Sequence, residues 1–118
     1  MKSRIIIFAS LLVFVACSSQ ETLSSDDKII PRDSMIMLMV DIHITDAILL
    51  QAVNHRKIQP NQIPSYYADL LKKHNVSKLR FDNSLQKYSD DLDDFSKMYD
   101  NIMAELSLKK AEQVTGKE

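Results

Sequence analysis

The sequence is poor in the residues on which most recognisable chemical sites depend. Its 118 residues include one cysteine, one glycine and no tryptophan. A single cysteine excludes an internal disulfide and a zinc site built on several thiolates. The only glycine, Gly116, lies close to the C-terminus, so no glycine-rich loop of the kind that cradles phosphate is present. These absences leave few ways to hold a cofactor, and we expect none.

Signals for β-structure and for nucleic-acid binding are also scarce. No segment alternates between apolar and polar residues in the manner of a strand, and no Asn-Gly or Asp-Gly pair marks a hairpin. Pro31, Pro60 and Pro64 separate segments whose apolar residues recur at helical spacing. The formal net charge is −1, which argues against a nucleic-acid partner. We therefore predict an all-α fold.

The N-terminus has the pattern of an export signal. Residues 1–16 combine a basic start, an apolar stretch and small residues before Cys17. The apolar stretch, residues 5–16, is too short to cross a bilayer core of about 30 Å as a helix. We therefore predict a signal peptide at residues 1–16 rather than a permanent transmembrane helix.

The end of this signal resembles a lipobox, the sequence at which bacterial lipoproteins are acylated and cleaved. Val15 and Ala16 precede Cys17 as expected, whereas Phe14 replaces the usual aliphatic residue. An ordinary cleaved signal with an incidental cysteine is the alternative. We predict that Cys17 carries fatty acyl chains of the palmitate type, which anchor the protein to a membrane.

A polar stretch separates this anchor from the rest of the chain. Residues 17–28 comprise the lipidated cysteine and a tether rich in Ser, Asp and Glu. Ser18 replaces the aspartate that retains some lipoproteins in the inner membrane. We therefore expect a cell-envelope protein anchored in the outer membrane, on either its periplasmic or its surface face.

Residues 29–108 are predicted to form a small bundle of about four helices, two long and two short, and residues 109–118 a polar tail. The two long helices are expected to pack antiparallel, with the short pair across one end. The predicted helix boundaries lie near Pro31 and Asn54, near Pro64 and Asn75, at Ser77, and at Asp90 and Asp91.

The last of these helices carries one continuous apolar stripe, which we assign to the core together with the aromatic side chains of the two short helices. The alternative use of those aromatic side chains is a groove for sugar or peptide. The stripe consists of Leu92, Phe95, Tyr99, Ile102 and Leu106, flanked by Met98 and Met103.

Three polar residues interrupt the apolar first helix and form the one candidate polar site. They are Asp41, His43 and Asp46. His43 and Asp46 are three positions apart, so they share a helix face and can form a hydrogen bond. Because a charge in a core is costly unless it is paired, a structural pair where two helices cross is the favoured interpretation. A ligand or proton-transfer site is the alternative.

No metal site is predicted. The acidic run at residues 90–94 lacks the glycine and the final glutamate of a calcium-binding loop, so we assign its carboxylates to the first turn of a helix. His43, His55 and His74 are too far apart in the sequence to form a helical metal-binding pair.

Three passages resemble an uncharacterised family of small lipoproteins of Bacteroidota-type bacteria, classed as a domain of unknown function. They are Ile30-Pro31 followed by Asp41-Ile42-His43 and Asp46-Ala47; Tyr67, Lys73-His74-Asn75-Val76-Ser77, Phe81, Ser84 and Tyr88; and Tyr99-Asp100 with Ile102 and Leu106. Lys87 departs from the pattern, since a second tyrosine is expected beside Tyr88. The resemblance implies an envelope lipoprotein and brings no activity or catalytic residue.

Three functional hypotheses follow. The first is a non-enzymatic lipoprotein whose helical domain binds another protein, or a second copy of itself, through the apolar first helix. The second is a chaperone-like module that holds apolar peptide segments in the periplasm. The third is an enzyme built around Asp41, His43 and Asp46. Open apolar grooves favour the second, and a concave pocket that exposes His43 and Asp46 together favours the third.

Overall fold

The computed structural model describes residues 28–116, so the predicted signal peptide and Cys17 lie outside the described residues. This part of the chain forms four α-helices and one short 3-10 helix, with no strand. The prediction of an all-α fold with two long and two short helices is therefore confirmed. The elements are α1 (Arg32–Asn54), η2 (Pro60–Gln62), α2 (Ile63–Lys73), α3 (Lys78–Ser89) and α4 (Leu92–Thr115).

Local signals in the sequence set most of the helix ends. Pro31 has an extended backbone (ψ 146°) and is the N-cap residue of α1, which agrees with the boundary predicted near Pro31. Asn75 is left-handed after α2 (φ 54°), as is typical of a residue that ends a helix. The Ser77 side chain accepts a hydrogen bond from the Arg80 backbone N–H, and Asp91 caps α4 in the same way.

Helix α4 does not end at Leu108, where the apolar stripe stops, but continues to Thr115. The segment that the sequence pattern assigned to a polar tail is therefore helical almost to its end. Lysine, alanine and glutamate favour helix, and no glycine or proline occurs between Leu108 and Gly116. The loss of the apolar stripe marks where packing ends rather than where the helix ends.

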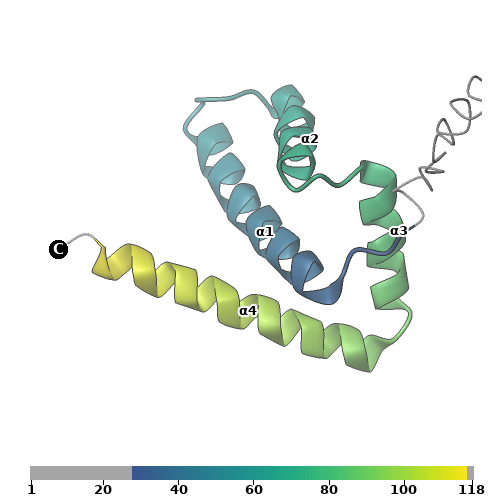
Figure 1. The fold of residues 1–118 in the computed structure, drawn as a ribbon. Coiled ribbons are helices and arrows are strands. Elements are labelled where there is room, and N and C mark those ends of the chain that lie inside the picture. Colours follow the sequence, from purple (N-terminus) through teal and green to yellow (C-terminus); the bar gives the residue numbers. More distant parts are fainter. Residues whose placement is uncertain (1–27, 117–118) are drawn as a thin grey trace, which may run out of the picture.

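The two long helices run in the same direction, so the predicted antiparallel arrangement is wrong. At their N-terminal ends, the Arg32 guanidinium contacts the Asp94 carboxylate at 2.6 Å, and further along, the Lys109 ammonium lies 3.4 Å from Asp41. Figure 1 shows α1 and α4 starting close together and diverging toward their C-terminal ends. Helices α2 and α3 run one after the other in the same general direction, and together they bring the chain back to the start of α4 (Figure 1).

The short helices do not lie across one end of a long pair, as predicted, but occupy different positions. Helix α2 packs beside α1, and α3 packs beside α4 near its start (Figure 1). Residues 28–31 are held against α3, where the fully buried Ser84 hydroxyl accepts a hydrogen bond from Ile30 N–H at 2.9 Å. The Tyr88 hydroxyl donates to the Ile30 carbonyl at 2.7 Å. These bonds satisfy backbone groups that would otherwise be buried without partners.

The core lies between the N-terminal half of α1 and the middle of α4. The predicted stripe on α4 is partly wrong: Leu92 is 77% exposed, whereas Met98, placed at its flank, is fully buried. The first turn of α4 meets the start of α1 through Asp94 and Arg32, and its Phe95 packs against the core, whereas Leu92 points to solvent. The buried cluster consists of Ile30, Met35, Ile36, Leu38, Met39, Val40, Met98 and Ile102.

The C-terminal half of α1 is less covered, with Ile48 59% and Leu50 64% exposed. Of the described helices, α1 is the one that is long and apolar enough to cross a membrane by length and composition, with a mean hydropathy of 1.7. Core helices of soluble proteins have the same property. Here α1 supplies most of the core, and its charged side chains meet partners on other helices.

Candidate functional site

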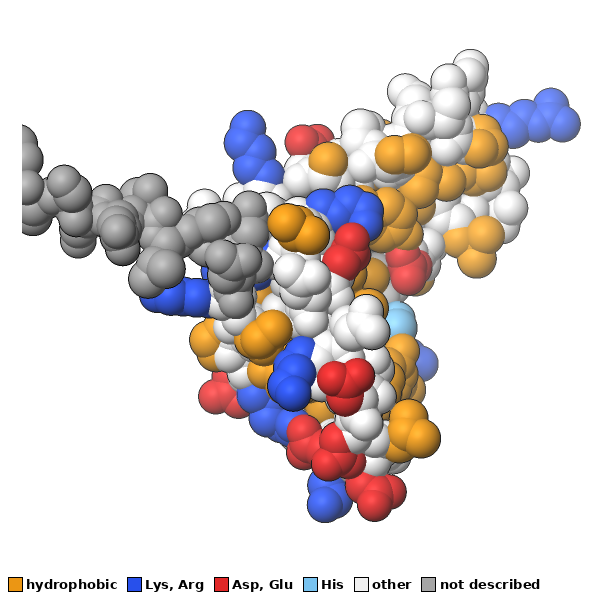
Figure 2. Space-filling model, turned by 90° about the vertical axis from the view of Figure 1, so that its right-hand side faces the viewer, with side chains coloured by type: hydrophobic (Ala, Val, Ile, Leu, Met, Phe, Trp, Pro, Cys, Tyr) orange, Lys and Arg blue, Asp and Glu red, His pale blue; other side chains and the backbone are white. Residues whose placement is uncertain are grey.

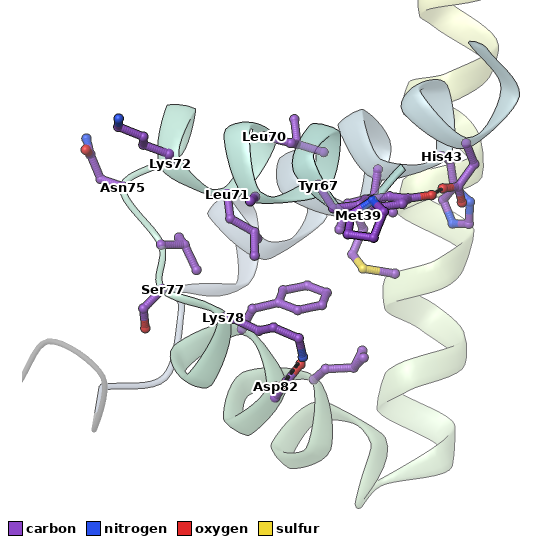
Figure 3. A pocket seen from close by; sticks show the side chains of 17 residues that line it. Met39, His43, Tyr67, Leu70, Leu71, Lys72, Asn75, Ser77, Lys78 and Asp82 are labelled. Atoms are coloured by element: carbon purple, nitrogen blue, oxygen red, sulfur yellow. Dashed lines mark hydrogen bonds and ion pairs between the residues drawn. The ribbon is translucent and has the colours of Figure 1, made fainter. Parts of the chain in front are cut away.

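An open, mainly apolar groove lies between α1, α2 and α3. Its volume is about 1000 Å³, at the upper end of the range of small-molecule binding pockets. Figure 3 shows α2 and α3 facing each other across it, with Leu71 pointing from α2 toward α3. Its apolar lining includes Met39 and Ile42 from α1, Tyr67, Ala68, Leu70 and Leu71 from α2, and Val76, Phe81 and Leu85 from the segment that follows.

The connection between α2 and α3 keeps the groove open. Asn75 turns the chain sharply, and the Val76 N–H donates to the Leu71 carbonyl at 3.0 Å. Ser77 then caps α3 at once. After this short connection, α3 packs beside α4 rather than on α2, and the groove lies between the two short helices and α1.

Charged and polar groups lie at the edges of the groove. The Lys78 ammonium contacts the Asp82 carboxylate at 2.6 Å, one helical turn further along α3. Lys72 and Asn75 also border the groove, and their side chains point outward from the space between the helices (Figure 3). Figure 2 shows one face of the molecule, on which exposed hydrophobic side chains gather beside lysines, arginines and carboxylates.

The structure gives the three predicted polar residues separate partners. His43 and Asp46 both line the groove, but no hydrogen bond joins them, so the predicted pair is wrong. The Tyr67 hydroxyl of α2 donates to Asp46, which lies exposed at the rim. The Tyr99 hydroxyl of α4 lies 3.0 Å from His43 Nε2, and the two rings meet edge to face.

Asp41 is the most heavily engaged of the three and lies outside the groove lining. One of its carboxylate oxygens lies 2.9 Å from His74 Nε2 and 3.7 Å from the Lys73 ammonium, and the other lies 3.4 Å from Lys109. Its side chain is 19% exposed. This carboxylate joins the middle of α1 to the end of α2 and to α4, which is the structural role favoured for charges at a helix crossing.

Two pKa shifts follow from these contacts. Burial by itself raises the pKa of Asp41, but the hydrogen bond with His74 and the positive charge of Lys109 outweigh it and lower that pKa below its ordinary value. The hydrogen bond from the Tyr67 hydroxyl to Asp46 raises the pKa of Tyr67. The tyrosine thus remains a proton donor at the groove rim and is not poised to act as a base.

The groove has no arrangement typical of a catalytic or metal centre. His43 and Asp46 each have a tyrosine hydroxyl as their hydrogen-bonded partner and do not bond to each other. Among residues 28–116, no three His, Cys, Asp or Glu side chains are placed to hold a metal ion. What the arrangement offers chemically is a large apolar surface with polar edges.

Sequence reasoning assigned several groove residues to the core. Tyr67 and Phe81 line the groove and Tyr66 is 41% exposed, so the assignment of the aromatic residues to the core holds only in part. Phe81, Tyr88, Phe95 and Tyr99 do pack against the core, so Phe81 both contacts the core and lines the groove. Helical spacing identifies the apolar face of α2 and α3, but it does not indicate whether another helix covers that face.

Residues 27–112 match the family model described as a domain of unknown function (DUF4296). The match spans all four helices except the last residues of α4. Neither the curated proteins nor the solved structures gave a match to the chain. The chemistry of the groove is therefore the basis for a functional conclusion.

Proposed function

The chain belongs to the DUF4296 family, and we propose that it is a membrane-anchored envelope lipoprotein whose groove binds apolar segments of other polypeptides. The single observation that carries this proposal is the open apolar groove between α1, α2 and α3. A concave, mainly apolar site with a few polar groups at its edges is the usual form of a ligand-binding site. The proposal contains no catalytic step and needs no cofactor.

The dimensions of the groove suit an amphipathic helix. Helix α2, which forms one wall, has 11 residues and so is about 16 Å long at 1.5 Å per residue. A helical ligand satisfies its own backbone hydrogen bonds and needs apolar contacts along one face. The lining of the groove supplies these apolar contacts. The polar side chains at its edges already bond to each other, Asp46 with Tyr67 and Lys78 with Asp82. Methionine and leucine side chains adapt to varied ligand surfaces.

Two other functions use parts of the same surface. An enzyme built around His43 and Asp46 would work in this groove, but both residues already bond to tyrosines, and Asp41 lies elsewhere. A second copy of the chain is an alternative protein partner for the exposed apolar part of α1. A monomer at high concentration in sedimentation measurements would exclude that partner.

The anchor is the part of the proposal that rests on sequence alone. Its support is the pattern of residues 1–17, with the apolar run ending at the only cysteine. Mass spectrometry of the N-terminal peptide, isolated from membranes, is expected to show Cys17 as the first residue and to carry the added mass of acyl chains. An unmodified N-terminus, or a protein recovered in soluble fractions, would contradict the anchor.

Peptide binding tests the groove. Because the chain has no tryptophan, a tryptophan-labelled amphipathic helical peptide reports binding through its own fluorescence. We expect it to bind the full-length protein in lipid nanodiscs, and a scrambled peptide without an apolar face not to bind. Ala68 is exposed on the groove wall, so Ala68→Arg places a charged side chain there and is expected to weaken binding at least tenfold.

The matched control is Ala111→Arg, which introduces the same side chain at an exposed position on the distal part of α4. It should leave peptide affinity unchanged. Equal weakening by both substitutions would mean that added charge, rather than the groove, decides binding.

A further inference from the structure

The described part of the chain begins on the helix that forms one wall of the groove. The Arg80 guanidinium Nε donates to the Lys28 carbonyl at 2.7 Å, so the chain enters the fold at the first turn of α3. The next turn of that helix carries Phe81 and Leu85, which line the groove. We infer that the fatty acyl chain on Cys17 is itself a ligand of the groove, an inference that rests on the proposed anchor and the proposed binding site.

The tether is long enough to bring the acyl chain of Cys17 to the groove. Ten residues lie between Cys17 and Lys28, and the eleven steps from one to the other reach at most about 40 Å at 3.3–3.6 Å per residue. The groove extends along α2, which is about 16 Å long. From its point of attachment on α3, the tether can therefore bring Cys17 to either end of the groove.

The charges on the tether and beside the groove also favour a tether that runs toward the groove. The segment before Lys28 carries Glu21, Asp26 and Asp27 and no basic residue. Four basic side chains surround the turn between α2 and α3, beside the groove. This basic corner consists of Lys72, Lys73, Lys78 and Arg80. Exposed ion pairs contribute little binding energy, so their effect is to direct the tether across the corner rather than to fix it there.

The groove fits an acyl chain by volume and by chemistry. An apolar cavity of 150 Å³ holds benzene, which is about 25 Å³ per carbon, so a chain of about sixteen carbons needs about 400 Å³. The groove of about 1000 Å³ has room for one or two such chains. An acyl chain has no hydrogen-bonding groups along its length, and the polar side chains at the groove edges are already bonded to one another.

Because the protein's own acyl chain occupies the groove, peptide binding depends on whether the protein is anchored in a membrane. The same apolar surface cannot hold the acyl chain and a peptide helix together. In the membrane, the bilayer takes the acyl chain and the groove is open to a peptide. Away from the membrane, the groove covers the acyl chain and excludes the peptide. The bilayer thus acts as a ligand that shifts the population toward the binding-competent state.

Photo-crosslinking from within the groove tests this inference on the full-length protein, purified from membranes. A photo-crosslinking amino acid is placed at Phe81 or, as a second position, at Leu71. The control position is Leu92, which is 77% exposed on α4 and lies outside the groove lining. After transfer into lipid-free buffer, mass spectrometry should find a crosslink between the groove position and the acyl chain of Cys17.

That crosslink is expected to be at least tenfold weaker in nanodiscs and absent from the Leu92 control. Acylated Cys17 with groove crosslinks only to phospholipid, detergent or another polypeptide, or with no crosslink, would overturn the inference and leave the anchor intact. An unacylated Cys17 in the same spectra would overturn the inference by removing the anchor itself. Crosslinking at Leu92 equal to that at Phe81 would also overturn it, because the acyl chain would then have no preferred site.

Discussion

Asp41 shows how one polar side chain organises this small domain. It lies in the middle of the most apolar helix, and its carboxylate meets His74, Lys73 and Lys109. A partly buried carboxylate with hydrogen-bonded partners stabilises the fold, whereas an amide in its place lacks the negative charge and one of the two acceptor oxygens. The residue was recognisable in the sequence as an anomaly, but its partners lie 32 to 68 positions away and no local spacing connects them.

Replacing Asp41 tests this role. Asp41→Asn is expected to lower the free energy of unfolding at pH 7 by about 1–3 kcal/mol, because it removes the charge from a hydrogen-bonded, partly buried network. Urea denaturation measures the change. Asp100→Asn, at an exposed position on α4, is the control and should change stability by less than about 0.5 kcal/mol.

The pKa of Asp41 gives this contribution a pH dependence. The folded-state pKa is lower than its ordinary value of 3.8, so the unfolded chain binds the proton more tightly. The stabilisation is complete above that ordinary value and is lost as the pH falls through the lower, folded value. The difference between the wild-type protein and Asp41→Asn should therefore shrink below about pH 4. A difference that stays constant down to pH 2 would contradict the shift.

At the scale of the helices, local sequence signals were sufficient for the elements and insufficient for their packing. Ser77, Asn75 and Asp91 mark helix ends through bonds to residues close in the chain, so the boundaries were predictable. The parallel course of α1 and α4 depends on how the three connections between them turn in space. Helical spacing carries no information on that, and the antiparallel expectation failed for this reason.

Helix α4 offers a direct test of where the core lies. Met98 is fully buried and Met103 is 54% exposed, although both flank the apolar stripe. Met98→Ala is expected to cost about 2–5 kcal/mol of stability, because it leaves a cavity between α1 and α4. Met103→Ala should stay within about 0.5 kcal/mol. Thermal or urea unfolding of the two variants compares them, and equal losses would show that this face of α4 packs differently.

At the scale of the whole molecule, the domain is small and its apolar surface is only partly used. A chain of this size cannot bury a large core, and no disulfide supports it. The core joins α1 to α4, while the apolar sides of α2 and α3 face an open groove. The sequence predicted the apolar residues themselves, but not that Tyr67 and Phe81 would face that groove. The same helical spacing is typical of residues in a core and of residues that line a groove.

The central claim is that the groove between α1, α2 and α3 is the binding site for apolar ligands. Methyl NMR of the nanodisc-anchored protein, titrated with the tryptophan-labelled amphipathic helix, tests it most directly. Leu108 and Val114 are exposed apolar residues on distal α4 and serve as internal controls. The account predicts shifts in the methyl signals of Met39, Ile42, Leu71, Val76 and Leu85, with Leu108 and Val114 unchanged. Bound peptide that leaves the groove methyls unmoved, or that shifts the α4 methyls instead, would contradict it.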